Sequence, residues 1–213
     1  MESIFIKNQI ILFQGDSITD CGRRKEMFFP MREGYPAKIA TIYKELYPNT
    51  PVQFVNRGIS GDRVCDILER YQEDIKDVQP DFISLLVGIN DVWRRYDENN
   101  PMSLEDFTKY YKQLLQQLKE DFSQVPIIMI EPFLIPTDPL KDKWHEDLDP
   151  KIQVVRKLAT EYATYYLAMD GIFASLVASK THQASELSLD GVHPTSLGHS
   201  VIATSWMELV GLL

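Results

Sequence analysis

Five short apolar runs, alternating with stretches of helical spacing, constrain the fold of this chain more than any other feature. They lie at residues 10–13, 52–55, 82–87, 127–130 and 165–169. Most of them are too continuous for a strand with one face in water, in which apolar and polar residues alternate. Continuous runs of this length are typical of strands in a parallel sheet that is covered on both faces.

The stretches between the runs predict helices. Apolar residues recur at intervals of three and four within residues 35–46, 64–75, 107–118, 152–162 and 196–210. Repeated alternation of strand and helix indicates βαβ units, whose right-handed crossovers place helices on both faces of the sheet. We therefore predict an α/β fold, a three-layer α/β/α sandwich with a central five-stranded parallel sheet, in a single domain over residues 1–213.

Residues 90–101 and 132–147 are predicted loops, longer than the usual ~2–6 residues between such elements. They follow the third and fourth strands, at the edge where open α/β sheets bind ligands, so we expect them to form pocket walls. They carry Trp93, Tyr96 and Trp144, which we predict to bind substrate. Flat aromatic rings suit the faces of sugars, although such residues also serve as loop anchors.

The net charge indicates which binding partners are disfavoured, and the cysteine content indicates the cellular compartment. The chain has 22 basic and 31 acidic side chains, a net charge of −9, which disfavours nucleic acid and anionic membrane as partners. The basic run at residues 23–25 is too short to change this. Cys21 and Cys65 are isolated, which suits a reducing compartment, and the first residues lack the pattern of a signal peptide. We predict a cytoplasmic protein.

The first candidate for chemistry is Ser17, in the sequence Gly15-Asp16-Ser17 after the first apolar run. Gly15 permits a tight turn, which leaves the Ser17 hydroxyl at the carboxyl edge of the sheet. In an alternative interpretation, Ser17 only caps the helix that follows. A phosphate-binding loop is disfavoured, because Asp16 and Asp20 would oppose an anion.

The second candidate is the pair Asp190 and His193, three residues apart near the end of the sequence. A carboxylate at this spacing can contact the imidazole, fix its tautomer and leave the far nitrogen free to take a proton. The alternative is an Asx-turn in which His193 is incidental. A zinc site that uses His193 and His199 is disfavoured, because their spacing matches no common zinc motif.

Two further residues offer hydrogen-bond donors at the same edge of the sheet. Gly61 follows the second strand and exposes a backbone N–H, and Asn90 follows the third strand with a side-chain amide. A tetrahedral oxyanion needs two or three such donors. Taken singly, the glycine is equally a turn residue and the asparagine a loop cap. Together with Ser17, Asp190 and His193, they indicate an acyl-transfer site.

Four blocks in this order, at residues 15–17, 56–61, 88–91 and 190–194, resemble those of the SGNH hydrolases, also called the GDSL esterase/lipase family. The resemblance implies that Ser17 is the nucleophile, His193 the base and Asp190 its orienting carboxylate. It also implies an oxyanion hole made of the Ser17 N–H, the Gly61 N–H and the Asn90 amide. A flavodoxin-like strand order and independence from metals and cofactors belong to the same expectation.

Residues 15–23 and 88–94 look like the intracellular acetyl-xylan esterase branch of that family. Members of this branch remove acetyl groups from sugar oligomers, and several are homo-oligomers. The resemblance allows a homo-oligomer for this chain, but the sequence does not determine its oligomeric state. We therefore predict a serine esterase that deacetylates xylo-oligosaccharide-type esters. The alternatives are a lysophospholipase or thioesterase for longer acyl chains, or a non-enzymatic flavodoxin-like binding or receiver module that uses Asp16 and Asp20.

Overall fold

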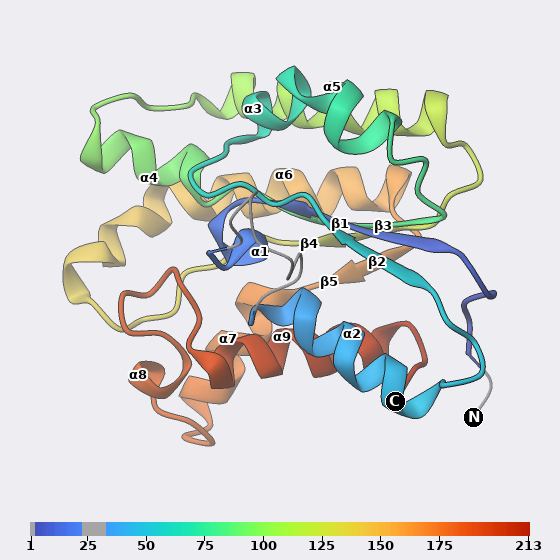
Figure 1. The fold of residues 1–213 in the computed structure, drawn as a ribbon. Coiled ribbons are helices and arrows are strands. Elements are labelled where there is room, and N and C mark those ends of the chain that lie inside the picture. Colours follow the sequence, from blue (N-terminus) through green and yellow to red (C-terminus); the bar gives the residue numbers. More distant parts are fainter. Residues whose placement is uncertain (1–2, 23–32) are drawn as a thin grey trace.

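The computed structural model describes residues 3–22 and 33–213, and Figure 1 shows a sheet between two layers of helices. Five parallel strands follow the order β2-β1-β3-β4-β5. The strands are β1 (Ile10–Gly15), β2 (Gln53–Asn56), β3 (Phe82–Leu86), β4 (Ile127–Ile130) and β5 (Tyr165–Leu167). The five-stranded parallel sheet and its flavodoxin-like order are confirmed. The basic run at residues 23–25 lies outside the described residues.

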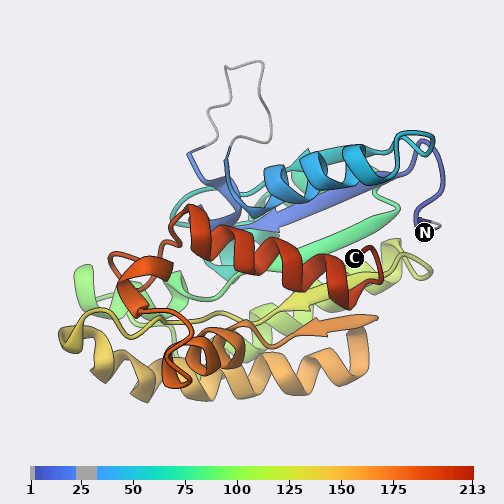
Figure 2. The same ribbon diagram turned by 90° about the horizontal axis from the view of Figure 1, so that it is seen from below.

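Helices cover both faces of the sheet (Figure 1, Figure 2). One face carries α3 (Val64–Glu69), α5 (Leu104–Asp121) and α6 (His145–Tyr162). The other carries α2 (Tyr35–Leu46), α7 (Met169–Ala178) and α9 (Ser196–Leu209). The predicted three-layer sandwich is therefore confirmed. Within residues 3–22 and 33–213, no helix combines the length and the apolar character needed to cross a bilayer.

The central strands explain why the apolar runs are continuous. Every residue of β3 and β4 is buried. Successive side chains of a strand point to opposite faces. In β4, Ile128 and Ile130 belong to the buried cluster that includes residues of α2 and α9, whereas Ile127 and Met129 belong to a second cluster that includes residues of α3 and α5. Because helices cover both faces, every position in these two strands carries an apolar side chain except Ser84, whose buried hydroxyl accepts a hydrogen bond from Trp206.

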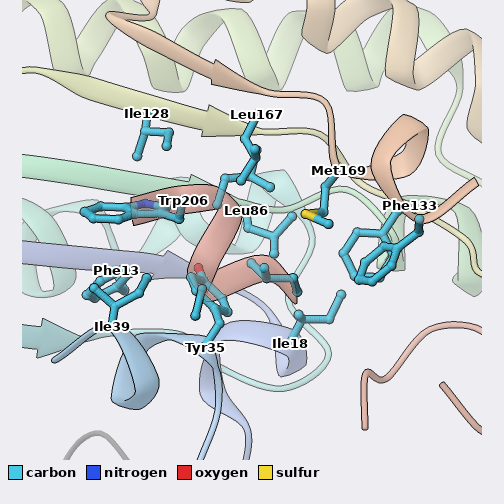
Figure 3. Close-up of a cluster of buried hydrophobic side chains, with 14 of the residues drawn as sticks. Phe13, Ile18, Tyr35, Ile39, Leu86, Ile128, Phe133, Leu167, Met169 and Trp206 are labelled. Atoms are coloured by element: carbon cyan, nitrogen blue, oxygen red, sulfur yellow. The ribbon is translucent and has the colours of Figure 1, made fainter. Parts of the chain in front are cut away.

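Trp206 of α9 anchors the last helix to the sheet (Figure 3). Its side chain is fully buried, and its indole N–H donates to the Ser84 hydroxyl of β3 at 3.2 Å. The ring centroid lies 5.9 Å from that of Phe13 in β1 and 5.6 Å from that of Phe82 in β3. The helix that follows His193 is thereby packed against the strand that precedes Ser17.

The prediction of two uninterrupted long loops is wrong. The first segment begins with the helix α4 (Asn90–Asp97), so Asn90 starts a helix rather than a loop. The second contains the 3-10 helix η2 (Pro139–Trp144), and α6 begins at His145, seven residues earlier than its apolar spacing indicated. The helical parts of both segments, residues 90–97 and 139–147, are mainly polar, which leaves little apolar periodicity from which to predict a helix.

Smaller differences concern the ends of elements. The predicted helix at residues 64–75 is split into α3 and the π-helix η1 (Gln72–Lys76), and the fifth strand ends at Leu167 because Met169 already begins α7. The helices α7 and α8 (Ala184–Leu187) have no counterpart in the prediction, and α1 (Ser17–Asp20) is expected only in the alternative in which Ser17 caps a helix. In Figure 1, α1, α4 and α8 lie at the same end of the sheet, beyond the carboxyl ends of the strands.

Candidate active site

Ser17 is the first residue of α1, directly after β1. At Gly15, β1 lies so close to β3 that an added Cβ would be 2.2 Å from the Leu86 carbonyl oxygen. Asp16 is the N-cap of α1, and its side chain accepts the Ile18 N–H at 2.9 Å. The interpretation of Ser17 as the cap is therefore wrong. Ile18 points into the apolar cluster of Figure 3, which fixes the turn beneath Ser17.

The structure brings Ser17, His193 and Asp190 into one chain of hydrogen bonds. The Ser17 Oγ lies 3.0 Å from the His193 Nε2, although the two residues are 176 positions apart. The His193 Nδ1 lies 2.7 Å from the Asp190 Oδ2. When Nδ1–H donates to the carboxylate, Nε2 is left as an acceptor for the Ser17 hydroxyl proton. This arrangement can turn a serine hydroxyl into a nucleophile.

The two carboxylate oxygens of Asp190 have different contacts. Oδ1 accepts the backbone N–H of Val192 at 2.9 Å and of His193 at 2.7 Å, while Oδ2 faces the imidazole. The turn is reinforced by Ser188, whose hydroxyl accepts the Gly191 N–H at 2.9 Å. The Asx-turn and the imidazole contact therefore coexist, and the turn holds the carboxylate against the ring.

Burial and the hydrogen-bonded partner shift the pKa values of Asp190 and His193 in opposite directions. The hydrogen bond from the imidazole to Asp190 and the negative charges of Asp190 and Asp16 raise the pKa of His193 above its usual 6.5, against partial burial and the cation of Lys141. Burial would raise the pKa of Asp190, but the hydrogen bonds from His193 and Val192 outweigh it and hold that pKa well below its usual range. Asp190 is thus ionised at neutral pH.

Asp16 is a fully buried carboxyl group beside the Ser17 turn. Burial raises its pKa from 3.8 to about 7, against the N–H of Ile18 and the nearby His193. Its Oδ2 atom has no hydrogen-bond partner among the described residues. The protonation of Asp16 therefore changes near neutral pH, and its charge acts on His193 without a direct hydrogen bond between the two side chains.

The two predicted oxyanion donors, the Gly61 N–H and the Asn90 side-chain amide, lie in neighbouring turns. Gly61 has a φ of +92°, a conformation that favours glycine. The Asn90 Nδ2 donates to the carbonyl oxygen of Asp62 at 2.9 Å. The guanidinium of Arg70 binds the Asp62 carboxylate and fixes the turn from the other side. Since this contact uses one N–H of the Asn90 amide, the other remains available as a donor.

The three predicted aromatic residues form one connected group next to His193. The Trp93 ring centroid lies 5.6 Å from that of His193 and 5.4 Å from that of Trp144. Tyr96 stacks on Trp144 at 5.0 Å with an interplanar angle of 6°. Trp144 is only 5% exposed, whereas Trp93 and Tyr96 are half-buried. Trp93 is thus the member in contact with the imidazole, and Trp144 supports it from behind.

Sequence reasoning missed Lys141 and the contact between Cys21 and His199. Lys141 donates to the carbonyl oxygen of Asp190 from a segment that the sequence suggested only as a pocket wall. The His199 Nε2 lies 3.5 Å from the Cys21 Sγ, and its Nδ1 accepts the Tyr35 N–H at 3.2 Å. Burial lowers the pKa of His199 to about 4, so this ring is a neutral structural group. No motif in the sequence signals either contact.

Comparison with known proteins agrees with this geometry. Residues 13–201 match the GDSL-like lipase/acylhydrolase family. The chain belongs to this family. The resemblance of its four sequence blocks to GDSL hydrolases is thereby confirmed. The protein is a carboxylic ester hydrolase.

Similarity extends over nearly the whole chain. An acetylxylan esterase from Geobacillus stearothermophilus is 32% identical over 209 residues, which cover 94% of this chain and 93% of the relative. The crystal structure of Axe2, an acetylxylan esterase from the same organism, matches with a TM-score of 0.86, 31% identity and coverage of 97% and 95%. A GDSL-like lipase structure from Parabacteroides merdae matches with a TM-score of 0.91, 33% identity and complete coverage of both chains.

Proposed function

We propose that Ser17, His193 and Asp190 are the catalytic triad of a serine esterase. The observation that carries the proposal is the continuous hydrogen-bonded path from the Ser17 Oγ through both nitrogens of His193 to the Asp190 carboxylate. His193 accepts the Ser17 proton as the hydroxyl attacks the ester carbonyl, and then protonates the departing alcohol. Water attacks the resulting acyl-enzyme, with His193 again as the base.

The developing oxyanion is assigned to the Ser17 N–H, the Gly61 N–H and the Asn90 amide. Support comes from the neighbouring turns, because Asn90 is hydrogen-bonded to Asp62, the residue after Gly61. Arg70 restrains the same turn, which keeps these donors fixed before the substrate arrives. Preorganised donors are worth more than mobile ones, since they cost no reorganisation during the reaction.

The proposed substrate is an acetyl ester on a xylo-oligosaccharide-type carbohydrate. Trp93 lies against the His193 ring, and Trp93 and Tyr96 are partly exposed aromatic rings of the kind that suit the face of a sugar, while the buried Trp144 supports both. Similarity to an acetylxylan esterase over 94% of the chain favours the same choice. The alternative, a lysophospholipase or thioesterase, predicts a preference for acyl chains of about eight or more carbons.

The triad is tested with Ser17→Ala and the matched control Ser200→Ala, a serine in α9 whose hydroxyl donates to the Ser196 carbonyl oxygen of its own helix. We expect Ser17→Ala to abolish hydrolysis of p-nitrophenyl acetate and labelling by a fluorophosphonate, while Ser200→Ala keeps both. Circular dichroism establishes that both variants are folded. Activity of folded Ser17→Ala equal to the wild type would refute the triad, and absence of labelling in the wild type would favour a binding or receiver module.

The substrate is tested by comparing acetylated xylo-oligosaccharides with esters of increasing acyl length. We expect kcat/KM to be highest for the acetylated sugar. A higher value for long acyl esters would favour the lysophospholipase or thioesterase alternative.

Three further parts of the proposal rest on the sequence. Residues 1–213 act as one domain, the protein works in the cytoplasm, and nucleic acid and membrane are not its partners. A homo-oligomer stays a prediction of the resemblance, which light scattering of the purified chain tests.

A further inference from the structure

Lys141 connects three segments of the candidate site. It lies in η2, and its ammonium group donates to the carbonyl oxygen of Asp190. The same Nζ atom lies 4.9 Å from the ring centroid of Trp93 in α4 and 5.1 Å from that of Trp144. A cation within about 6 Å of an indole face is attracted to the ring. One side chain thus contacts the aromatic group and the peptide of the residue that orients His193.

The aromatic contacts make this position of the ammonium group well defined. Trp144 is almost fully buried and stacked on Tyr96, so it offers a rigid surface to the cation. Trp93 lies close to Lys141 and also close to the His193 imidazole. A displacement of Lys141 therefore affects the ring that packs against His193 as well as the Asp190 peptide.

The turn at Asp190 is held at a second point by the same segment of chain. The Ile135 N–H donates to the Gly191 carbonyl oxygen at 2.8 Å. Gly191 has a φ of +85°, and an added Cβ would be 2.8 Å from the Ile135 carbonyl oxygen. The segment after β4 thus holds residues 190 and 191 through Ile135 and Lys141. Of these two contacts, only the one from Lys141 brings a charge to the site.

We propose that Lys141 is a positioning residue for the Asp190–His193 pair, holding the Asp190 peptide and the Trp93 ring in the geometry that the reaction needs. This inference rests on the proposed esterase mechanism. It assigns a role to a residue outside the four sequence blocks of the family. The contacts predict a loss in kcat rather than in KM, because Lys141 acts on the groups that move the proton.

The charge of Lys141 gives the proposal a second measurable consequence. Among the described residues, the charged or titratable groups that act on His193 are Asp190 in its own turn, Asp16 before α1, His199 in α9 and Lys141 in η2. The two carboxylates raise the pKa of His193, and Lys141 lowers it. Removing the cation raises the pKa of His193 further. Since the base must be neutral, the acidic limb of kcat/KM then moves to higher pH.

The experiment compares Lys141→Met, Lys141→Gln and Lys141→Arg with the control Lys157→Met, an exposed lysine of α6. We expect Lys141→Met to lower kcat on p-nitrophenyl acetate about tenfold, with KM changed less than about threefold. Lys141→Arg keeps the charge and the donor, and retains most of kcat. Lys141→Gln keeps a donor without charge, so it retains part of kcat but shifts the acidic limb to higher pH. Lys157→Met matches the wild type.

Two results overturn the inference. One is a wild-type kcat and an unshifted acidic limb in folded Lys141→Met. The other, which applies if that variant fails to fold, is an unshifted limb in Lys141→Gln. Both are distinct from a failure of the proposed function, which is recognised by full activity of Ser17→Ala. In that case Lys141 has no triad to position, and both proposals fall.

Discussion

Asp16→Asn tests the electrostatics of the buried carboxyl group beside Ser17. Asparagine keeps the Oδ1 atom that accepts the Ile18 N–H, so the cap of α1 is retained. What the substitution removes is a carboxyl group whose Oδ2 has no hydrogen-bond partner among the described residues. The variant therefore separates the cost of a buried charge from the loss of a helix cap.

The magnitude follows from the two pKa values. Burial raises the pKa of Asp16 from 3.8, taken for the unfolded chain, to about 7 in the folded protein. Below pH 3.8 both states bind the proton and the group contributes nothing to the pH dependence. Between pH 3.8 and about 7, Asp16 is ionised in the unfolded chain but still protonated in the folded protein, so the wild type loses stability as the pH rises. Above about pH 7 the group is ionised in both states, and the loss of stability stays constant. Between pH 5 and pH 9, only the roughly two pH units from pH 5 to about 7 contribute. The free energy of unfolding of the wild type therefore falls by about 2 to 3 kcal/mol over this interval.

The assay is urea unfolding of the wild type and Asp16→Asn, followed by circular dichroism at pH 5, 7 and 9. The unpaired amide N–H of asparagine has a cost of its own, but this cost is the same at each pH and cancels from the comparison. We expect the free energy of unfolding of the wild type to fall by about 2 to 3 kcal/mol relative to the variant between pH 5 and pH 9.

The control for this comparison is Asp142→Asn, at an exposed position of η2. Its free energy of unfolding is expected to follow that of the wild type at all three pH values. A difference between the wild type and Asp16→Asn that stays constant from pH 5 to pH 9 would show that the folded protein does not hold a proton on Asp16, and the reasoning from burial would be refuted.

Three other measurements follow from the structure. The kcat/KM of the wild type falls as pH drops through the pKa of His193, with a midpoint above 6.5 because Asp190 and Asp16 raise that pKa; a midpoint below 6 contradicts this. Trp206→Ala lowers the free energy of unfolding by about 3 to 5 kcal/mol in urea, because a fully buried ring is lost, and a loss under about 1 kcal/mol would argue against its role as an anchor. Asn90→Ala lowers kcat on p-nitrophenyl acetate by about 10²–10³, and an unchanged kcat in the folded variant removes Asn90 from the oxyanion hole.

The sheet and the pairing of distant motifs could be predicted, because both depend on signals that are strong in the sequence. Fully buried strands such as β3 and β4 give continuous apolar runs. The end of β1 predicts the place of Ser17, whereas His193 lies in the loop before α9, and its pairing with Ser17 is predicted from the resemblance of the four blocks to GDSL hydrolases.

Other features had no comparable signal. The helix α4 is rich in polar residues, and two of its first residues, Asn90 and Asp91, are buried polar groups that face neighbouring turns. Lys141 reaches a backbone carbonyl 49 residues away and two indole faces, none of which leaves a pattern in the sequence. His199 is recognised as a buried partner of Cys21 only when residues 178 positions apart are placed in space. Contacts of these kinds depend on tertiary packing, which local spacing does not encode.

The separation of 176 residues between the hydroxyl and the imidazole has a consequence during protein synthesis. A nascent chain carries Ser17 long before the ribosome adds His193, so an incomplete chain has the proposed nucleophile without its proposed base. With the proposed triad, hydrolysis can begin only after the segment that contains α9 has left the exit tunnel and docked onto strands made much earlier. If the proposed triad acts, activity requires the complete fold, and local detachment of α9 from the folded protein abolishes activity while the sheet is still intact.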